Sequence, residues 1–125
     1  MATWTSDGLN KIGTAEELRI AGLKPDGTLR KPTIIWVVRV GDGLYVRSVN
    51  GRSSGWFRGI QAGHEGRIWA GGVQKDVTFV EIPDPAINEQ IDRAYATKYR
   101  RYAASIIDSI NGPKAGAATL QLLPR

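Results

Sequence analysis

Cysteine is absent from this sequence of 125 residues, and histidine and methionine each occur once. Without cysteine the chain can form neither disulfides nor thiolate metal sites. The longest apolar run, residues 33–38, is far shorter than the roughly 20 residues of a membrane-spanning helix. The first residues also lack the basic and apolar stretches of a secretory signal. We therefore expect a cytoplasmic protein that has no thiolate metal site and does not enter a membrane.

Positive charge is unevenly distributed along the chain. The length fits one domain, residues 1–125, because domains commonly contain about 100–150 residues. The net charge of +5 comes from residues 30–67, where seven basic residues and two acidic residues give +7 − 2 = +5. The basic residues are Arg30, Lys31, Arg39, Arg47, Arg52, Arg58 and Arg67. Arginine binds phosphate and carboxylate oxygens well, so the segment indicates an anionic partner; the alternative is a basic face that only aids solubility.

Alternating apolar and polar residues predict several antiparallel strands. Residues 33–40 are apolar on both faces, so we expect this strand, with Trp36, to be buried on both sides. A helix should begin at Asp84 as N-cap and Pro85, and continue to residue 110. The other predicted elements are a helix at residues 7–12 and strands at residues 17–23, 44–49, 67–70, 73–82 and 118–122. Their order predicts an α+β fold with a closed or nearly closed sheet.

Residues 47–59 form the most unusual segment, because small and polar residues follow a buried strand without alternation. Glycines and serines let backbone amides and hydroxyls face an anion, and a helical turn at residues 56–62 would add its N-terminus. Arg30 and Lys31, before the central strand, offer a second phosphate contact. The alternatives are an ordinary surface loop and a basic turn that protects a sheet edge.

Few other side chains suggest chemistry. His64 is the only histidine and a weak candidate for an acid, a base or an axial metal ligand; the alternative is an ordinary loop residue. No second ligand stands at metal spacing and no nucleophile elbow is present. Trp56 is the best candidate for contact with a flat ring, whereas the apolar stripe of the long helix indicates packing. The stripe consists of Ile87, Ile91, Tyr95, Tyr99 and Tyr102.

Several strings in the chain resemble a bacterial family, the domain of unknown function 2255. They are Arg30-Lys31-Pro32, Ile35-Trp36-Val37-Val38, residues 44–51, Trp56-Phe57-Arg58, residues 64–68, Ala70-Gly71-Gly72 and Asp76-Val77. This family is in turn similar to the split-barrel flavoproteins, which include pyridoxamine-phosphate oxidases and deazaflavin-dependent nitroreductases. The resemblance implies a small antiparallel split β-barrel of about six strands with flanking helices, a flavin mononucleotide or deazaflavin cofactor, and a homodimer.

The same resemblance implies which residues bind the cofactor and its phosphate. They are Arg30, Lys31, Ser48, Val49, Asn50, Gly51, Arg52, Trp56 and Arg58. We therefore predict a flavin- or deazaflavin-dependent oxidoreductase of unknown substrate, in which the cofactor performs the redox step and the protein orients it. The alternative is a non-catalytic module that binds another phosphate-bearing or anionic small molecule on the same barrel. The lack of a nucleic-acid-binding motif disfavours a nucleic-acid partner.

Overall fold

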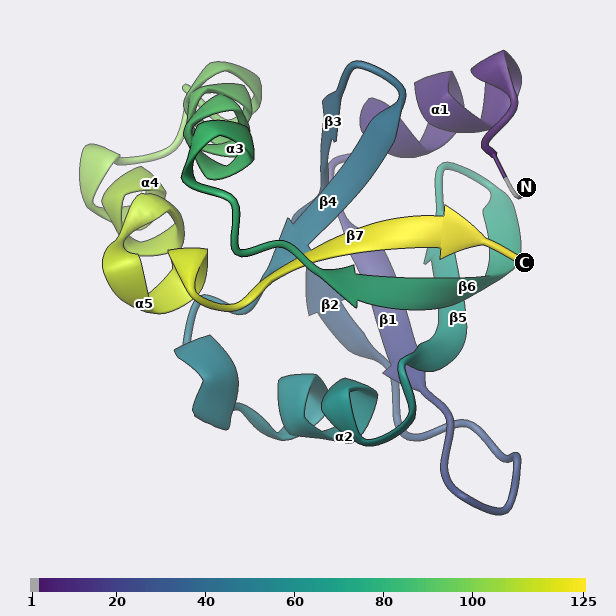
Figure 1. Cartoon of the computed structure of the whole chain (residues 1–125). Coiled ribbons are helices and arrows are strands. Elements are labelled where there is room, and N and C mark those ends of the chain that lie inside the picture. Colours follow the sequence, from purple (N-terminus) through teal and green to yellow (C-terminus); the bar gives the residue numbers. More distant parts are fainter. Residues whose placement is uncertain (1–2) are drawn as a thin grey trace.

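A strongly curled sheet of seven antiparallel strands forms the centre of the protein (Figure 1). The computed structural model describes residues 3–125. The strand order across the sheet is β2-β1-β5-β6-β7-β4-β3. The strands are β1 (Leu18–Gly22), β2 (Thr33–Ile35), β3 (Val38–Val40), β4 (Gly43–Arg47), β5 (Glu65–Ala70), β6 (Val73–Glu81) and β7 (Thr119–Pro124).

Strands β2 and β3 lie at opposite edges of the sheet, although only Trp36 and Val37 separate them in the chain. β2 pairs with β1, whereas β3 pairs with β4. The chain therefore crosses from one edge to the other at Trp36 and Val37, and the sheet curls into a split barrel. This crossing divides the strand predicted at residues 33–40. Burial on both sides holds only for Val37 and Val38, because Ile34 is 60% exposed and Trp36 is half-buried.

The barrel interior holds one continuous apolar core. Successive strand residues point to opposite faces, so every second side chain of β6, such as Val77 and Phe79, enters it. Helices α1 (Ser6–Gly13) and α2 (Gly55–Gly63) add side chains such as Ile12 and Phe57. Helix α1 contains the helix predicted at residues 7–12, and it is capped by Thr5, whose side chain accepts a hydrogen bond from the amide of Gly8 at 3.0 Å.

A second apolar cluster lies between the barrel and helices α3 (Pro85–Lys98), α4 (Ala104–Asn111) and α5 (Pro113–Gly116), which gather on one side in Figure 1. Asp84 caps α3 as predicted, and the predicted stripe packs into this cluster. The single long helix predicted at residues 84–110 is wrong, because the chain leaves the helix at Tyr99. A straight helix of that length would extend about 40 Å, whereas the break brings α4 back onto the same cluster.

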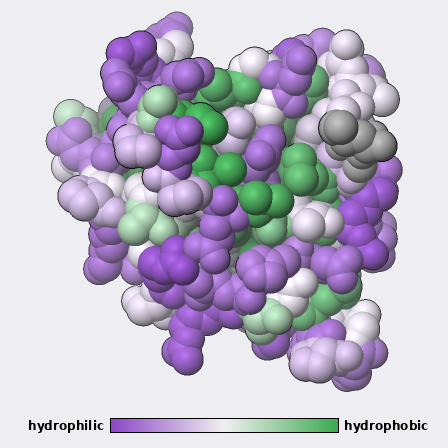
Figure 2. Space-filling model, in the orientation of Figure 1, coloured by the Kyte–Doolittle hydropathy of each residue, from purple (hydrophilic) through white to green (hydrophobic). Residues whose placement is uncertain are grey.

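Hydrophilic side chains dominate the face shown in Figure 2, with hydrophobic side chains visible between them. Among residues 3–125, no helix has the length and apolar character needed to cross a membrane. The same residues contain no group of three or more histidine, aspartate and glutamate side chains placed to hold a metal ion.

Candidate functional site

A pocket of about 320 Å³ lies where β2, the segment after β4, helix α2 and helix α4 meet; we call it the β2 pocket. Small-molecule sites commonly have volumes of roughly 300–1,000 Å³, so this pocket suits at least part of a ligand. Its lining residues are Thr33, Ile34, Ile35, Trp36, Arg47, Ser48, Val49, Asn50, Trp56, Ile106 and Ile110.

Apolar side chains exposed to solvent gather at this pocket. Ile34, Val49 and Ile106 line it, and they are three of the four large hydrophobic residues that are exposed in the described part of the chain. Trp36 and Trp56 line it as well, and both are half-buried. Single exposed apolar residues are ordinary, whereas a gathered set is typical of a surface that binds a ligand or partner.

Polar groups gather where the pocket meets the N-terminus of α2. The hydroxyl groups of Ser48 and Ser54 are 2.7 Å apart, and Ser54, the N-cap residue, makes no side-chain bond to the helix. The first amides of α2 therefore have no partner within the helix, and they carry the positive end of its dipole. With Ser48 and Asn50 in the pocket wall, this end favours an anionic group.

Arg30 lies against the same helix. A Cβ atom on Gly59 would come within 2.8 Å of Arg30 Cδ, so any side chain at this position would force the Arg30 side chain to shift. The Nε atom of Arg30 is buried and has no hydrogen-bond partner among the described residues. Buried donors are nearly always paired, so Arg30 offers an unused donor beside α2. Lys31 and Arg58 are exposed, and neither makes an ion pair within residues 3–125.

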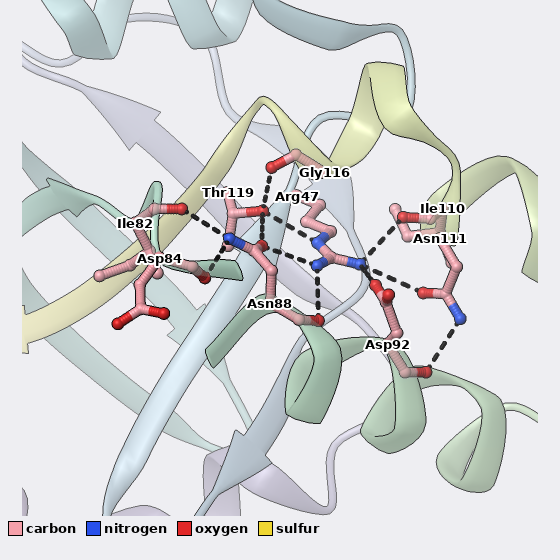
Figure 3. A network of polar contacts seen from close by, with 9 residues as sticks. All are labelled: Arg47, Ile82, Asp84, Asn88, Asp92, Ile110, Asn111, Gly116 and Thr119. Atoms are coloured by element: carbon pink, nitrogen blue, oxygen red, sulfur yellow. Dashed lines mark hydrogen bonds and ion pairs between the residues drawn. The ribbon is translucent and has the colours of Figure 1, made fainter. Parts of the chain in front are cut away.

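Arg47 also lines the pocket, but its guanidinium is committed to the protein (Figure 3). Its side chain is completely buried, and it donates to Asp92 Oδ1 at 2.5 Å, Asn88 Oδ1 at 2.8 Å and Thr119 Oγ1 at 2.9 Å. Further bonds reach the backbone oxygens of Asn88 and Ile110 and the side chain of Asn111. These contacts occupy the five N–H groups of arginine, and they tie β4 to α3, α4 and β7.

Other arginines of the basic segment are also paired. Arg52 NH1 lies 2.6 Å from Glu81 Oε1 and donates to the backbone oxygen of Ala117 at 2.9 Å. The hydrogen bond from Arg52 holds the pKa of Glu81 below its usual value. Arg67 pairs with Asp76, and Arg39 with Asp42 and Asn10. Within this segment, the cations that have no acidic partner among residues 3–125 are therefore Arg30, Lys31 and Arg58.

The structure brings only some of the predicted site residues together. Ser48, Val49, Asn50 and Trp56 line the β2 pocket. Gly51 is buried beside them, and its φ of +80° explains why glycine stands there. Arg30, Lys31, Arg52 and Arg58 lie outside the lining, and Arg52 borders another cavity with Glu81.

His64 lies away from this pocket. It ends α2 in the left-handed conformation with φ of +59°, and its amide donates to the carbonyl of Ile60 at 2.7 Å. Its own carbonyl accepts from the amide of Phe79 at 2.8 Å. The backbone of His64 thus serves as a helix cap, and the residue is exposed outside the pocket lining.

Sequence reasoning did not assign Ile34, Trp36, Ile106 and Ile110 to the site. Their apolar character indicates a core position as readily as a pocket wall. Only the folded chain brings these four residues together at one pocket, and for Ile106 and Ile110 that depends on how α4 returns to the barrel.

The sequence profile of one family, described as "Uncharacterized protein conserved in bacteria (DUF2255)", matches residues 8–122. This match confirms the predicted family resemblance. A search of curated proteins found no match.

Solved structures of the same fold include proteins of several functions. The haem storage protein HutZ of Vibrio cholerae has a TM-score of 0.64 and 14% identity, with 89% of this chain and 82% of that chain covered. A FAD-binding protein of Mesorhizobium loti has a TM-score of 0.60 and 18% identity, covering 98% and 91%. A reductase dependent on the reduced deazaflavin F420 has a TM-score of 0.61 and 11% identity, covering 86% and 93%. Identities this low establish the split-barrel fold alone.

Proposed function

Because this chain belongs to the bacterial family DUF2255 and has the split-barrel fold, we propose that it is a flavin- or deazaflavin-dependent oxidoreductase with its cofactor in the β2 pocket. The observation that carries the proposal is the division of this pocket. One part is apolar and bears Trp36 and Trp56, and the other meets serine hydroxyls and the N-terminus of α2. A flavin nucleotide has the matching parts, a flat apolar ring and a phosphate.

The residues fit such a cofactor at both ends. Trp36 and Trp56 offer aromatic surface to the ring. Ser48, Asn50 and the first amides of α2 would receive phosphate, and Arg30 would bring its unused Nε–H and its positive charge. We propose that Val49 and Gly51 shape this end, while Lys31, Arg52 and Arg58 contribute charge at longer range.

The bound cofactor would supply the redox chemistry, and the chain would supply binding, orientation and exclusion of water. Ile34, Val49 and Ile106 are exposed at the mouth of the pocket, so one copy of the chain leaves the mouth open to solvent. We propose that a second copy covers this apolar rim and completes the pocket.

A non-catalytic binding function is the second candidate. The haem storage protein with the same fold favours it, because haem is also flat and carries anionic groups. Binding without redox turnover would need the same apolar walls and the same anion-favouring end. The proposed oxidoreductase and this candidate therefore differ in the ligand that is retained.

The first experiment measures which ligand the purified, untagged protein retains. The protein is incubated with flavin mononucleotide, a deazaflavin or haem, then desalted, and its visible absorbance is recorded. Retention of a flavin or deazaflavin is the expected result. Retention of haem alone favours the binding module, and retention of none of the three contradicts the proposed flavin-type cofactor.

A pair of variants tests the phosphate contact. Arg30→Ala combined with Lys31→Ala should weaken flavin mononucleotide binding by at least about 30-fold, since hydrogen bonds to charged groups contribute roughly 1.5–3 kcal/mol each. The control is Arg93→Ala combined with Arg100→Ala, which removes the same charge from exposed positions of α3 and the turn after it. If the two double variants weaken binding equally, Arg30 and Lys31 act only through their general positive charge and make no specific phosphate contact.

A further inference from the structure

The crossing between β2 and β3 is held by the C-terminal end of α3. Val37 has no strand partner there, but its carbonyl accepts a hydrogen bond from Lys98 Nζ at 2.6 Å. Its amide donates to the hydroxyl of Tyr99 at 3.2 Å, and that hydroxyl donates to the carbonyl of Glu16 at 2.8 Å. Side chains of α3 therefore replace a neighbouring strand at the point where the barrel edge changes.

The ring of Tyr99 fixes the neighbouring residue of the crossing as well. Trp36 stacks on Tyr99 with ring centroids 3.9 Å apart and planes inclined by only 4°. Aromatic pairs left to themselves prefer offset or edge-to-face arrangements, so a parallel pair this close requires rings held by their surroundings. Tyr99 is held in this way, because it is 1% exposed and its hydroxyl is bonded to two backbone segments.

Trp36, whose ring is held by this stacking, is also a wall of the β2 pocket. Trp36 lines the pocket and Tyr99 does not, so Tyr99 acts on a ligand there indirectly, and Trp36 is the lining residue on which its ring stacks. Tyr102 also contacts Trp36, at 4.9 Å, but its ring is tilted by 51° and offers a smaller stacking surface. The orientation of one pocket wall thus depends on a residue outside the pocket.

We infer that Tyr99 is a positioning residue, which holds the indole of Trp36 in place as a wall of the β2 pocket. Loss of the Tyr99 ring frees the indole to rotate, whereas loss of the hydroxyl alone leaves the stacked pair. The expected effect on binding of a flat cofactor rests on the proposed function. The effect on the orientation of Trp36 in the ligand-free protein is independent of it.

The first arm of the test observes Trp36 in the ligand-free protein. Changing Trp4, Trp56 and Trp69 to phenylalanine leaves Trp36 as the only tryptophan, and acrylamide quenching of its fluorescence then reports its accessibility. Tyr99→Leu should raise the quenching constant by about twofold or more through local opening, and Tyr99→Phe should leave it nearly unchanged. Tyr99→Met serves as the ring deletion if the leucine variant does not fold.

Tyr95→Leu is the matched control for loss of stability. Tyr95 lies in α3, four residues before Tyr99, and is equally buried, but its ring stacks on Tyr99, at 6.1 Å, and not on Trp36. It should destabilise the protein to a similar degree without changing the quenching of Trp36. If the Tyr99 and Tyr95 deletions change quenching equally, or neither changes it, the inference is overturned.

The second arm uses the chain with its natural tryptophans and measures the dissociation constant of flavin mononucleotide. Tyr99→Leu should weaken binding by about tenfold, and Tyr95→Leu by less than about threefold. Unchanged affinity in Tyr99→Leu, with Trp36 more accessible, would overturn the link between Tyr99 and the pocket. If the unchanged chain binds no flavin, the proposed function fails, while the quenching arm still decides whether Tyr99 positions Trp36.

Discussion

The buried guanidinium of Arg47 makes the stability of this fold depend on Asp92. Asp92 is the only acidic partner of Arg47 within residues 3–125, at 2.5 Å, and the remaining acceptors of Arg47 are neutral. Asp92→Ala removes the countercharge and leaves the positive charge of Arg47 buried. The substitution replaces a residue of α3 by a good helix former, so helix propensity does not add to the loss.

The expected cost follows from burial. Removing one partner of a buried ion pair commonly costs about 3–5 kcal/mol, because the charge that remains has lost its countercharge. The side chain of Asp92 is 41% exposed, and Arg47 keeps its bonds to Thr119 and Asn88, so the lower end applies. We expect the free energy of unfolding to fall by about 3 kcal/mol and the Tm by roughly 10 °C for a chain of this size.

Urea denaturation followed by far-ultraviolet circular dichroism measures this loss, with the slope m expected to stay constant. Glu89→Ala is the control on the same helix, because its pair with Arg93 is exposed and should contribute less than about 1 kcal/mol. Asp92→Asn keeps an oxygen acceptor and should fall between the two. A loss in Asp92→Ala no larger than in Glu89→Ala would show that the neutral acceptors alone satisfy Arg47.

The pH dependence of stability and the close approach at Gly59 each give a further prediction. Burial lowers the pKa of Lys98 to about 8, so between about pH 8 and 10 the unfolded chain holds a proton that the folded chain has lost. The free energy of unfolding in urea should therefore rise with pH by roughly 1 kcal/mol, allowing for partial exposure, and Lys98→Met should abolish the rise. Above about pH 10 it should fall, because burial raises the pKa of Tyr95 and Tyr99. Gly59→Ala brings a methyl group to 2.8 Å from Arg30 Cδ and should weaken flavin mononucleotide binding by about tenfold, whereas Gly63→Ala, with open space around it, should not.

Local sequence signals predicted much of the secondary structure. Asp84 and Pro85 start α3 because the cap and the missing amide are properties of those residues alone. The stripe through Ile91 and Tyr95 is buried because helical spacing places those residues on one face. The barrel itself was predicted through family resemblance, since periodicity indicated only a closed or nearly closed sheet.

Features that depend on long-range contacts were not predictable in this way. Residues 33–40 have the composition of one strand, and nothing local shows that the two halves pair at opposite edges of the sheet. Ile106 belongs to the pocket only because the chain breaks after α3 and α4 turns back. Arg47 was counted with the basic segment, although its acceptors on α3 lie more than 40 residues away in the chain.

The ion pairs of the basic segment leave positive charge uncompensated at only a few of its residues, and this links the fold to the proposed site. Arg39, Arg47, Arg52 and Arg67 each have an acidic partner, which reduces their contribution to the local field. The cations of the segment that have no acidic partner within residues 3–125 are then Arg30, Lys31 and Arg58. Arg30 packs on α2 at Gly59, next to Arg58 in the chain, so the uncompensated charge concentrates beside this helix. The N-terminus of α2 also lacks a side-chain cap at the pocket. The positive charge and the free amides therefore favour an anion in the same region. A phosphate that binds there would place an attached ring within reach of Trp56 and the apolar wall.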